Sequence, residues 1–345
     1  MIKVLVVDDS PLVRQLLTHL LSDTPDIQVV GSAEDPYEAR ELIKKLHPDV
    51  LTLDIEMPKM DGIAFLRNLM KLKPMPVIMV STLTEKGAAI TLEALSIGAV
   101  DFILKPKSDL TNKLMDYREE LIDKIRFAFK SKIRPHTSIP KPIVTKDKTS
   151  YLQNQVIAIG ASTGGTEAIQ RVICQLPTNL PPIVIAQHIP AAFSASFAKR
   201  LNKNAGMTVI EAQGGEQLKY GTAYLAPGNA HLIVEKRGMS LYTKLLDTEP
   251  VNRHKPSVDV LFDSVADSVG KAALGVILTG MGQDGAKGLL KMKKQGSFTL
   301  AQDEASSVVW GMPGAAVDIN ASSEVLHIDR IPPKILSLLT SKKKH

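Results

Sequence analysis

The chain has 345 residues, enough for two domains of ordinary size, and its 44% hydrophobic and 23% charged residues exclude a chain that is disordered throughout. The formal net charge of +6 is unevenly placed: residues 130–150 carry six Lys or Arg against one acid, and Lys342, Lys343 and Lys344 add three positive charges, so the rest of the chain sums to about −2. Because neither half is basic, we predict that the protein binds no nucleic acid.

The chain shows no sign of export or of membrane insertion. It begins with the strand-like run "IKVLVV" instead of a charged start, an apolar stretch and a cleavage site. No apolar stretch reaches the roughly 18 residues of a membrane-spanning helix. The single cysteine, Cys174, excludes an internal disulfide, and we expect it to be packed inside a helix. These features predict a cytoplasmic protein without membrane insertion.

Strand-like and helix-like segments alternate over the first 110 residues. Apolar residues three and four apart predict helices over Leu12–Leu21 and Pro36–Leu46, and a helix from about Asn112 to Lys130 would close the domain. Such alternation predicts a doubly wound parallel sheet. The predicted strands are residues 3–9, 29–35, 49–55, 76–82 and 101–106.

A second domain of the same class follows a linker. The segment from about Ser131 to Gln155 is rich in Pro, Lys, Ser and Thr and has no apolar period, which predicts the linker. Pro227, Gly228 and Asn229 separate two short strand-like runs and predict a hairpin. The predicted fold class is therefore α/β, with two doubly wound parallel-sheet domains joined by a linker. The apolar runs of the second half are residues 156–159, 183–186, 222–226, 231–235, 274–278 and 298–301.

Polar side chains follow four predicted strands of the first domain. Asp8 and Asp9 follow the first strand, Asp54 ends the third, Ser81 ends the fourth and Lys105 ends the fifth. The carboxyl ends of parallel strands meet at one edge of a sheet, where ligands bind. Three carboxylates gathered there favour a hard divalent cation such as Mg²⁺, and a nearby lysine stabilises a phosphoryl group carried by an aspartate. The pattern predicts a phosphoryl-accepting site.

The segments "VLVVDDS", "LDIEMPKMDG", "MVST" and "GAVDFILKP" together resemble the receiver domain of the response regulators of two-component signalling. The resemblance covers residues 1–125 and implies a flavodoxin-like fold. It also implies that Asp54 is the phosphorylated residue, that Mg²⁺ is bound by Asp8, Asp9 and Asp54, and that Lys105 and the Ser81 hydroxyl contact the phosphoryl group.

The turn "GASTGG", residues 160–165, follows an apolar run and precedes a segment of helical period. The turn lacks the Lys-Ser/Thr ending of a P-loop. It also lacks one glycine of the dinucleotide fingerprint, because Ser162 stands at the third position. It does match Gly-x-Ser-x-Gly, the sharp turn that exposes a nucleophilic serine. His188 and Asp284 follow later apolar runs and would complete a triad with Ser162. His231 and His254 are competing bases.

Two other functions fit parts of this pattern. The loop "GMGQDG", residues 280–285, reads as G-x-G-x-x-G, and Asp303 follows about 20 residues on, at the position of a ribose-binding acid. The pattern alone supports dinucleotide binding and hydrolysis almost equally, although dinucleotide binding leaves Ser162 and His188 without a role. A non-catalytic module that docks on a partner is the other alternative.

The segments "AIGASTGG", "AQHIP", "YLAPGNAHL" and "ILTGMGQDGAKGL" are similar to the catalytic domain of the chemotaxis protein-glutamate methylesterases. The resemblance covers residues 153–340 and implies a Rossmann-like domain, with residues 126–152 as a helix end and a flexible linker. It implies that Ser162 is the nucleophile, His188 the general base, Asp284 the acid that orients the base, and the backbone amide of Met281 part of the oxyanion hole.

The function implied by this resemblance is that of a phosphorylation-regulated serine esterase in chemotaxis. Such an enzyme hydrolyses γ-methyl esters of glutamate on methyl-accepting chemoreceptors, releases methanol, and deamidates specific receptor glutamines. A chemotaxis-type histidine kinase would be the phosphodonor and Mg²⁺ would serve phosphorylation, whereas the esterase reaction would need no cofactor.

Overall fold

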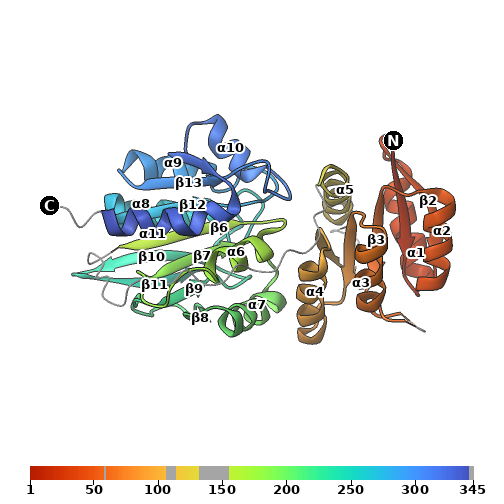
Figure 1. Ribbon diagram of the computed structural model, residues 1–345, viewed down its shortest axis with the longest axis horizontal. Coiled ribbons are helices and arrows are strands. Elements are labelled where there is room, and N and C mark those ends of the chain that lie inside the picture. The colour runs from red at the N-terminus through yellow and green to blue at the C-terminus, as the bar shows by residue number, and fades with distance from the viewer. Residues whose placement is uncertain (58–59, 106–113, 132–154, 342–345) are drawn as a thin grey trace. The chain divides into compact units, whose positions relative to one another are not determined.

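The computed structural model describes residues 1–57, 60–105, 114–131 and 155–341, and the chain divides into two compact units, Met1–Thr137 and Ser138–His345 (Figure 1). Most of the predicted linker and the basic tail, residues 342–344, lie outside the described residues. Within the described ranges, no helix has both the length and the apolar character that crossing a bilayer requires.

The first unit contains a parallel sheet of five strands in the order β2-β1-β3-β4-β5 (Figure 1). This is the flavodoxin-like order, in which the ligand site lies beside β1 and β3, where the direction of winding reverses. The strands are β1 (Ile2–Val7), β2 (Ile27–Ala33), β3 (Val50–Asp54), β4 (Val77–Ser81) and β5 (Asp101–Leu104), and the helices are α1 (Pro11–Ser22), α2 (Pro36–Leu46), α3 (Gly62–Leu72), α4 (Glu85–Ile97) and α5 (Leu114–Lys130).

Local sequence explains these elements. Every residue of β3 and β4 is buried, as expected for central strands that helices cover on both faces. The side chains of Ser10, Asp35 and Thr84 accept backbone N–H groups at the starts of α1, α2 and α4, and proline occupies the first position of α1 and α2. These capping residues thus fix the position at which each of the three helices begins.

The second unit contains a parallel sheet of seven strands in the order β14-β13-β12-β6-β7-β9-β8, and a separate antiparallel pair, β10 with β11 (Figure 1). The prediction of two parallel-sheet α/β domains is therefore confirmed. The strands are β6 (Val156–Ala161), β7 (Ile183–Gln187), β8 (Thr208–Glu211), β9 (Thr222–Leu225), β10 (His231–Arg237), β11 (Ser240–Leu246), β12 (Ala273–Ile277), β13 (Phe298–Gln302) and β14 (Glu324–Leu326); the α-helices are α6 (Gly165–Ile173), α7 (Ala191–Asn204), α8 (Val258–Val269), α9 (Ala286–Lys294), α10 (Met312–Asp318) and α11 (Ile331–Ser341).

The hairpin predicted at residues 227–229 is wrong. Strand β9 pairs in parallel with β7 and β8, whereas β10 pairs with β11 in the other sheet. Gly228 instead allows a close approach to the start of α7, because a Cβ there would lie 2.3 Å from the Ala191 nitrogen. The hairpin turn lies between β10 and β11, where Gly238 adopts a left-handed φ of +59°.

Cys174 lies directly after α6, not inside it, and is only 5% exposed. Burial raises the pKa of its thiol to about 11, so the thiol stays protonated near neutral pH. The expectation of a packed cysteine is confirmed, but its place in a helix is not.

Strand β6 lies at the point where the winding of the second sheet reverses. The chain places β7, β9 and β8 on one side of β6, and then β12, β13 and β14 on the other. Gly160 of β6 packs against α8, since a Cβ there would lie 2.1 Å from Cγ1 of Val258 and 3.1 Å from Cζ of Phe262. The first glycine of the Gly-x-Ser-x-Gly turn is therefore required by the packing of a helix.

The substitution Gly160→Ala should lower the free energy of unfolding of this unit by about 1–3 kcal/mol, because the added methyl group overlaps buried Val258. Denaturant titration followed by the fluorescence of Trp310, the single tryptophan, measures this. A second change, Val258→Ala, should recover part of the loss caused by the first. The matched control is Gly206→Ala, whose nearest neighbour would be 3.3 Å away; equal losses in the two Gly→Ala variants would contradict the packing argument.

Candidate active site

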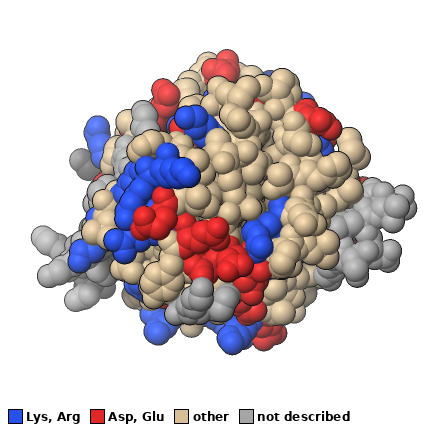
Figure 2. Space-filling view, turned by 90° about the vertical axis from the view of Figure 1, so that its right-hand side faces the viewer, with Lys and Arg blue, Asp and Glu red and all other residues tan. Residues whose placement is uncertain are grey.

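In the first unit, three aspartates meet at the carboxyl ends of β1 and β3. Asp8, Asp9 and Asp54 each offer a carboxylate oxygen, and these oxygens lie within 4.8 Å of one another. Asp8 and Asp54 are buried and Asp9 is exposed. The face of this unit seen in Figure 2 carries Asp and Glu side chains gathered in one patch. A set of oxygen donors at this spacing fits Mg²⁺.

Lys105 neutralises part of this charge. Its Nζ lies 2.8 Å from Oδ2 of Asp54 and 3.1 Å from Oδ2 of Asp8. Burial, together with the Asp8 carboxylate, raises the pKa of Asp54 to about 6 against the opposing effect of Lys105. One lysine thus offsets the repulsion among the three aspartates only in part, which favours a further cation at this edge.

The predicted position of Ser81 is correct, but its hydroxyl is turned elsewhere. It accepts a hydrogen bond from Oγ1 of Thr91 at 2.7 Å and donates to the Thr82 carbonyl at 3.3 Å. Thr91 lies in α4, so the hydroxyl links the end of β4 to this helix.

In the second unit, Ser162 lies in a tight turn between β6 and α6. Its N–H donates to the carbonyl of Thr279 at 3.0 Å, and its carbonyl accepts from the Gly165 N–H at 2.7 Å. Gly164 adopts a left-handed φ of +74°, which closes the turn. The Ser162 side chain is half-buried, and no described residue forms a hydrogen bond with its hydroxyl. The hydroxyl is thus available at the end of a strand.

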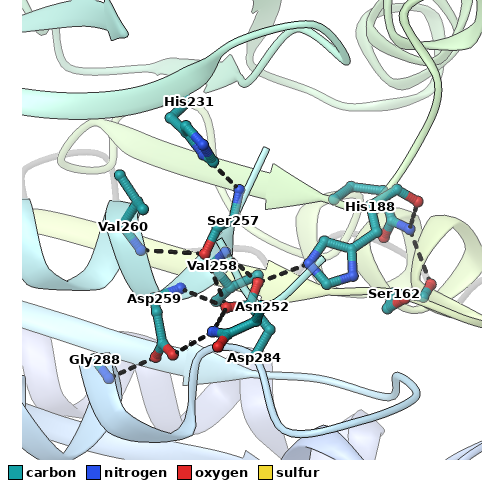
Figure 3. A network of polar contacts seen from close by, with 11 residues as sticks. Ser162, His188, His231, Asn252, Ser257, Val258, Asp259, Val260, Asp284 and Gly288 are labelled. Carbon is teal, nitrogen blue, oxygen red and sulfur yellow. Dashed lines mark hydrogen bonds and ion pairs between the residues drawn. The ribbon is translucent and has the colours of Figure 1, made fainter. Parts of the chain in front are cut away.

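His188 follows β7 and faces both other members of the predicted triad. Its Nε2 lies 2.8 Å from Oδ2 of Asp284, and in Figure 3 the opposite side of the ring is turned toward Ser162. Because a carboxylate only accepts hydrogen bonds, Nε2 carries the proton and Nδ1 has the free electron pair. Nδ1 is buried and has no hydrogen-bond partner among the described residues. Nδ1, not Nε2, is therefore the nitrogen placed to act as a base.

The carboxylate of Asp284 lies at the start of α8 and accepts five hydrogen bonds (Figure 3). Oδ2 accepts from His188 and from the Val258 N–H at 2.6 Å, and Oδ1 accepts from Asn252, from the Ser257 hydroxyl and from the Asp259 N–H. Burial alone would raise the pKa of Asp284, but the donors, His188 first, outweigh it and keep the pKa well below its usual range. Asp284 is therefore ionised near neutral pH.

The competing histidines have other positions. His231 is fully buried; its Nε2 lies 3.1 Å from the Glu249 carbonyl and its Nδ1 accepts from the Ser257 N–H at 3.0 Å, which leaves no free nitrogen for a base. The His254 ring stacks on the His188 ring, with centroids 3.7 Å apart and planes 15° apart. His254 therefore covers one face of the proposed base.

The geometry disfavours a dinucleotide at the loop of residues 280–285. In that fingerprint the helix N-terminus binds a pyrophosphate, but here Oδ1 of Asp259 accepts the Gly288 N–H in the first turn of α9 at 2.7 Å. Asp303 bonds the N–H of Ser306, three residues on, as a local turn residue. Gly280 lies under Ser162, since a Cβ there would be 2.8 Å from the serine Cβ.

Comparison with known proteins finds one family model for each unit. Residues 157–335 match the family model "CheB methylesterase", and residues 4–115 match "Response regulator receiver domain". The chain belongs to the CheB methylesterase family. It is 52% identical to protein-glutamate methylesterase/protein-glutamine glutaminase 1 of Xanthomonas campestris pv. campestris, with 98% of this chain and 97% of that protein covered.

A second curated relative comes from Hydrogenovibrio crunogenus and is named protein-glutamate methylesterase/protein-glutamine glutaminase; it is 50% identical, with 98% of this chain and 99% of that protein covered. Among solved structures, the catalytic domain of Thermotoga maritima CheB methylesterase matches 54% of this chain and all of that chain, with a TM-score of 0.53 and 37% identity. The chain is thus a CheB-type methylesterase with a receiver domain, and both resemblances drawn from the sequence are confirmed.

Several residues of the CheB-type site are not predicted by any sequence motif. Gln187, next to His188, donates from Nε2 to the carbonyls of Ser162 at 2.9 Å and of His188 at 3.1 Å, so it ties the two backbones together. Asn252 and Ser257 bond Asp284 from a loop that carries no recognised motif. The only sequence signal for Gln187 is its place at the end of an apolar strand, where a polar residue needs a partner.

The substitution Asp284→Asn should lower the free energy of unfolding by about 1–3 kcal/mol near neutral pH, because an amide nitrogen would face buried N–H donors. The pKa of Asp284 is depressed by folding, so its charge stabilises the fold above the unfolded pKa of about 4, and this stabilisation is lost as the pH falls below that value. The difference from the wild type should therefore shrink below about pH 4.

Denaturant titrations at several pH values, read from Trp310 fluorescence, measure that difference. Asp267→Asn is the control, since its carboxylate forms only an exposed ion pair with Lys291 and contributes little. A destabilisation by Asp284→Asn that is the same at all pH values would contradict the argument.

Proposed function

We propose that this chain hydrolyses γ-methyl esters of glutamate on methyl-accepting chemoreceptors, with release of methanol, and deamidates specific receptor glutamines. The observation that carries the proposal is the pairing of His188 with Asp284, with Nδ1 of His188 turned toward a free serine hydroxyl. Relatives at 50–52% identity are named for the same two activities. A role in chemotaxis adaptation follows from this substrate.

We assign the nucleophile to Ser162, the general base to His188 and the orienting acid to Asp284. Oγ of Ser162 attacks the ester carbonyl while its proton passes to Nδ1 of His188, and the new imidazolium is stabilised by Asp284. The tetrahedral oxyanion accepts a hydrogen bond from the Met281 N–H, for which no described residue is an acceptor. The C–O bond to methanol then breaks as His188 returns the proton, and water hydrolyses the acyl-enzyme by the same route.

The same steps on a glutamine side chain release ammonia in place of methanol, so one site serves both reactions. Each step uses only this chain's side chains, its backbone and water, and we propose that the esterase reaction needs no cofactor. A protonated His188 is required to expel ammonia, a poorer leaving group than methanol.

We propose that the receiver domain regulates the esterase. A chemotaxis-type histidine kinase would transfer its phosphoryl group to Asp54. Lys105 would contact the phosphoryl oxygens, and the Ser81 hydroxyl would do so after turning away from the Thr82 carbonyl. Asp8, Asp9 and Asp54 would bind Mg²⁺, which when bound neutralises the negative charge that builds up during transfer. We assign residues 1–125 to the receiver, 126–152 to a helix end and linker, and 153–340 to the catalytic domain.

The variant Ser162→Ala should fold normally and release no methanol from methyl-labelled chemoreceptor membranes, a loss of at least about a thousandfold, because no other hydroxyl replaces the nucleophile. Its unfolding should match the wild type within about 0.5 kcal/mol. Ser196→Ala, on α7, is the matched control and should keep full activity. Sustained methanol release by Ser162→Ala would refute the assigned nucleophile.

A small-molecule phosphodonor with Mg²⁺ should increase methanol release by the wild type but not by Asp54→Asn, since an amide cannot accept the phosphoryl group. Asp23→Asn, at the exposed end of α1, should respond like the wild type. If the donor also stimulates Asp54→Asn, the phosphorylation site lies elsewhere; if it stimulates neither protein, receiver control is wrong while the esterase assignment stands.

A further inference from the structure

Asn252 lies between two buried carboxylates. Its Nδ2 donates to Oδ1 of Asp284 at 2.7 Å and to Oδ2 of Asp259 at 2.8 Å (Figure 3). A side-chain amide has two N–H bonds on this nitrogen, so each carboxylate receives one. The second oxygen of Asp259 is fixed by the Gly288 N–H of α9, at 2.7 Å. Asn252 therefore connects a carboxylate of α8, which an N–H of α9 holds in place, to the carboxylate that bonds His188.

The backbone of this loop places Asn252 in a left-handed conformation. Its φ is +53° and that of Arg253 is +68°. Asn is one of the few residues other than glycine that adopts this region at low cost. The same loop stacks His254 on His188 and bonds Ser257 to Asp284. Residues 252–257 thus contact both members of the His–Asp pair.

We propose that Asn252 is a positioning residue for the reaction: with Asp259 as its fixed support, it keeps the Asp284 carboxylate in place against His188. The proposal rests on the roles assigned above to Ser162, His188 and Asp284. Asn252 touches neither the nucleophile nor the substrate-facing nitrogen, so its effect passes through Asp284.

Electrostatics explains why a donor is needed at this point. Two carboxylates that share one neighbouring nitrogen repel each other, and an N–H directed at each relieves the repulsion. Consistently, the bond from Asn252 lowers the pKa of Asp284, while burial, with a contribution from the charge of Asp284, raises the pKa of Asp259.

Several charged and titratable groups face this network. His188 faces Asp284, and His254 faces His188. Asp263, one turn along α8, adds to the negative potential at Asp259. Lys287 of α9 lines a small pocket of about 60 Å³ together with Asn252 and Asp259. Asn252 itself donates one N–H to each of the two carboxylates.

Two substitutions separate positioning from a purely structural role, because both residues tolerate a left-handed φ. Asn252→Gly removes the carboxamide and keeps the turn. Asn252→Asp keeps the size of the side chain but places a third carboxylate where a donor is needed. Both should lower kcat by about tenfold to one hundredfold, with KM for the methylated receptor little changed, because a bond to a charged group is lost.

The pH profile of kcat/KM is the deciding measurement. An Asp284 carboxylate that has lost its donor binds the proton on the His188–Asp284 pair more tightly, so the acid limb should move to higher pH. The shift should be larger for Asn252→Asp than for Asn252→Gly, whereas a role in packing alone would make the smaller residue the worse variant. Asn320→Gly, a second asparagine with a positive φ of +57°, whose side-chain oxygen accepts from Lys293, is the control and should leave the profile unchanged.

Each outcome has one meaning. The proposal is supported if the acid limb of the kcat/KM profile moves to higher pH in both variants, and most in Asn252→Asp. Acid limbs that coincide with the wild type, whether or not the rate falls uniformly, overturn it while leaving the triad in place. If the wild type itself releases no methanol, the proposed function fails first. The network is then tested by NMR of the His188 Nε2 proton, whose chemical shift should change in Asn252→Asp and stay as in the wild type in Asn320→Gly; an unchanged shift in Asn252→Asp overturns the proposal.

Discussion

The second unit depends on one buried negative charge, the carboxylate of Asp284. Three N–H groups of the backbone and side chains, one hydroxyl and one imidazole bond it, and together they join the loop after β12, the start of α8 and the loop after β7. Burying a charge is costly unless its hydrogen-bonding capacity is filled. The elements that fill it here are therefore held in one arrangement, and the base is oriented as a consequence.

Close backbone packing makes that arrangement possible. Strand β6 approaches α8 at Gly160, and the loop after β12 passes under Ser162 at Gly280; at each position a Cβ would come within 3 Å of a neighbouring atom. Such distances are closer than a side chain allows. The glycines that resemble a phosphate-binding fingerprint in the sequence are thus used to bring the nucleophile, the start of α8 and the acid into one site.

Much of the fold, and the placement of several site residues, could be predicted from the sequence, because parallel strands align their carboxyl ends whatever their order. Polar residues that follow apolar runs, such as Asp54, His188 and Asp284, were correctly placed on sheet edges by that rule. The rule says nothing about pairing between strands that are not helix-connected, so the turn at Gly228 was misread as a hairpin.

The alignment of strand ends also predicts neither the orientation of a histidine ring nor the contacts made by a loop. That Nε2 of His188 bonds the acid, and that Asn252 and Gln187 support the pair, depends on side-chain directions and on a loop with two consecutive left-handed residues. Nothing in the residue types "VNRHKPS" distinguishes such a loop from an ordinary surface turn.

The two sites show how neighbours give one residue type opposite properties. Asp54, at the end of β3, and Asp284, in the loop after β12, are both buried aspartates, yet folding raises the pKa of the first to about 6 and depresses that of the second. Among the described residues, Asp54 accepts a backbone N–H from Ile55 and pairs with Lys105, and it faces the Asp8 carboxylate. Its charge is incompletely balanced, which suits a group that must gain a cation and a phosphoryl group. The carboxylate of Asp284 is already bonded by five donors, so it can orient His188 and stabilise the imidazolium that forms there while it stays ionised itself.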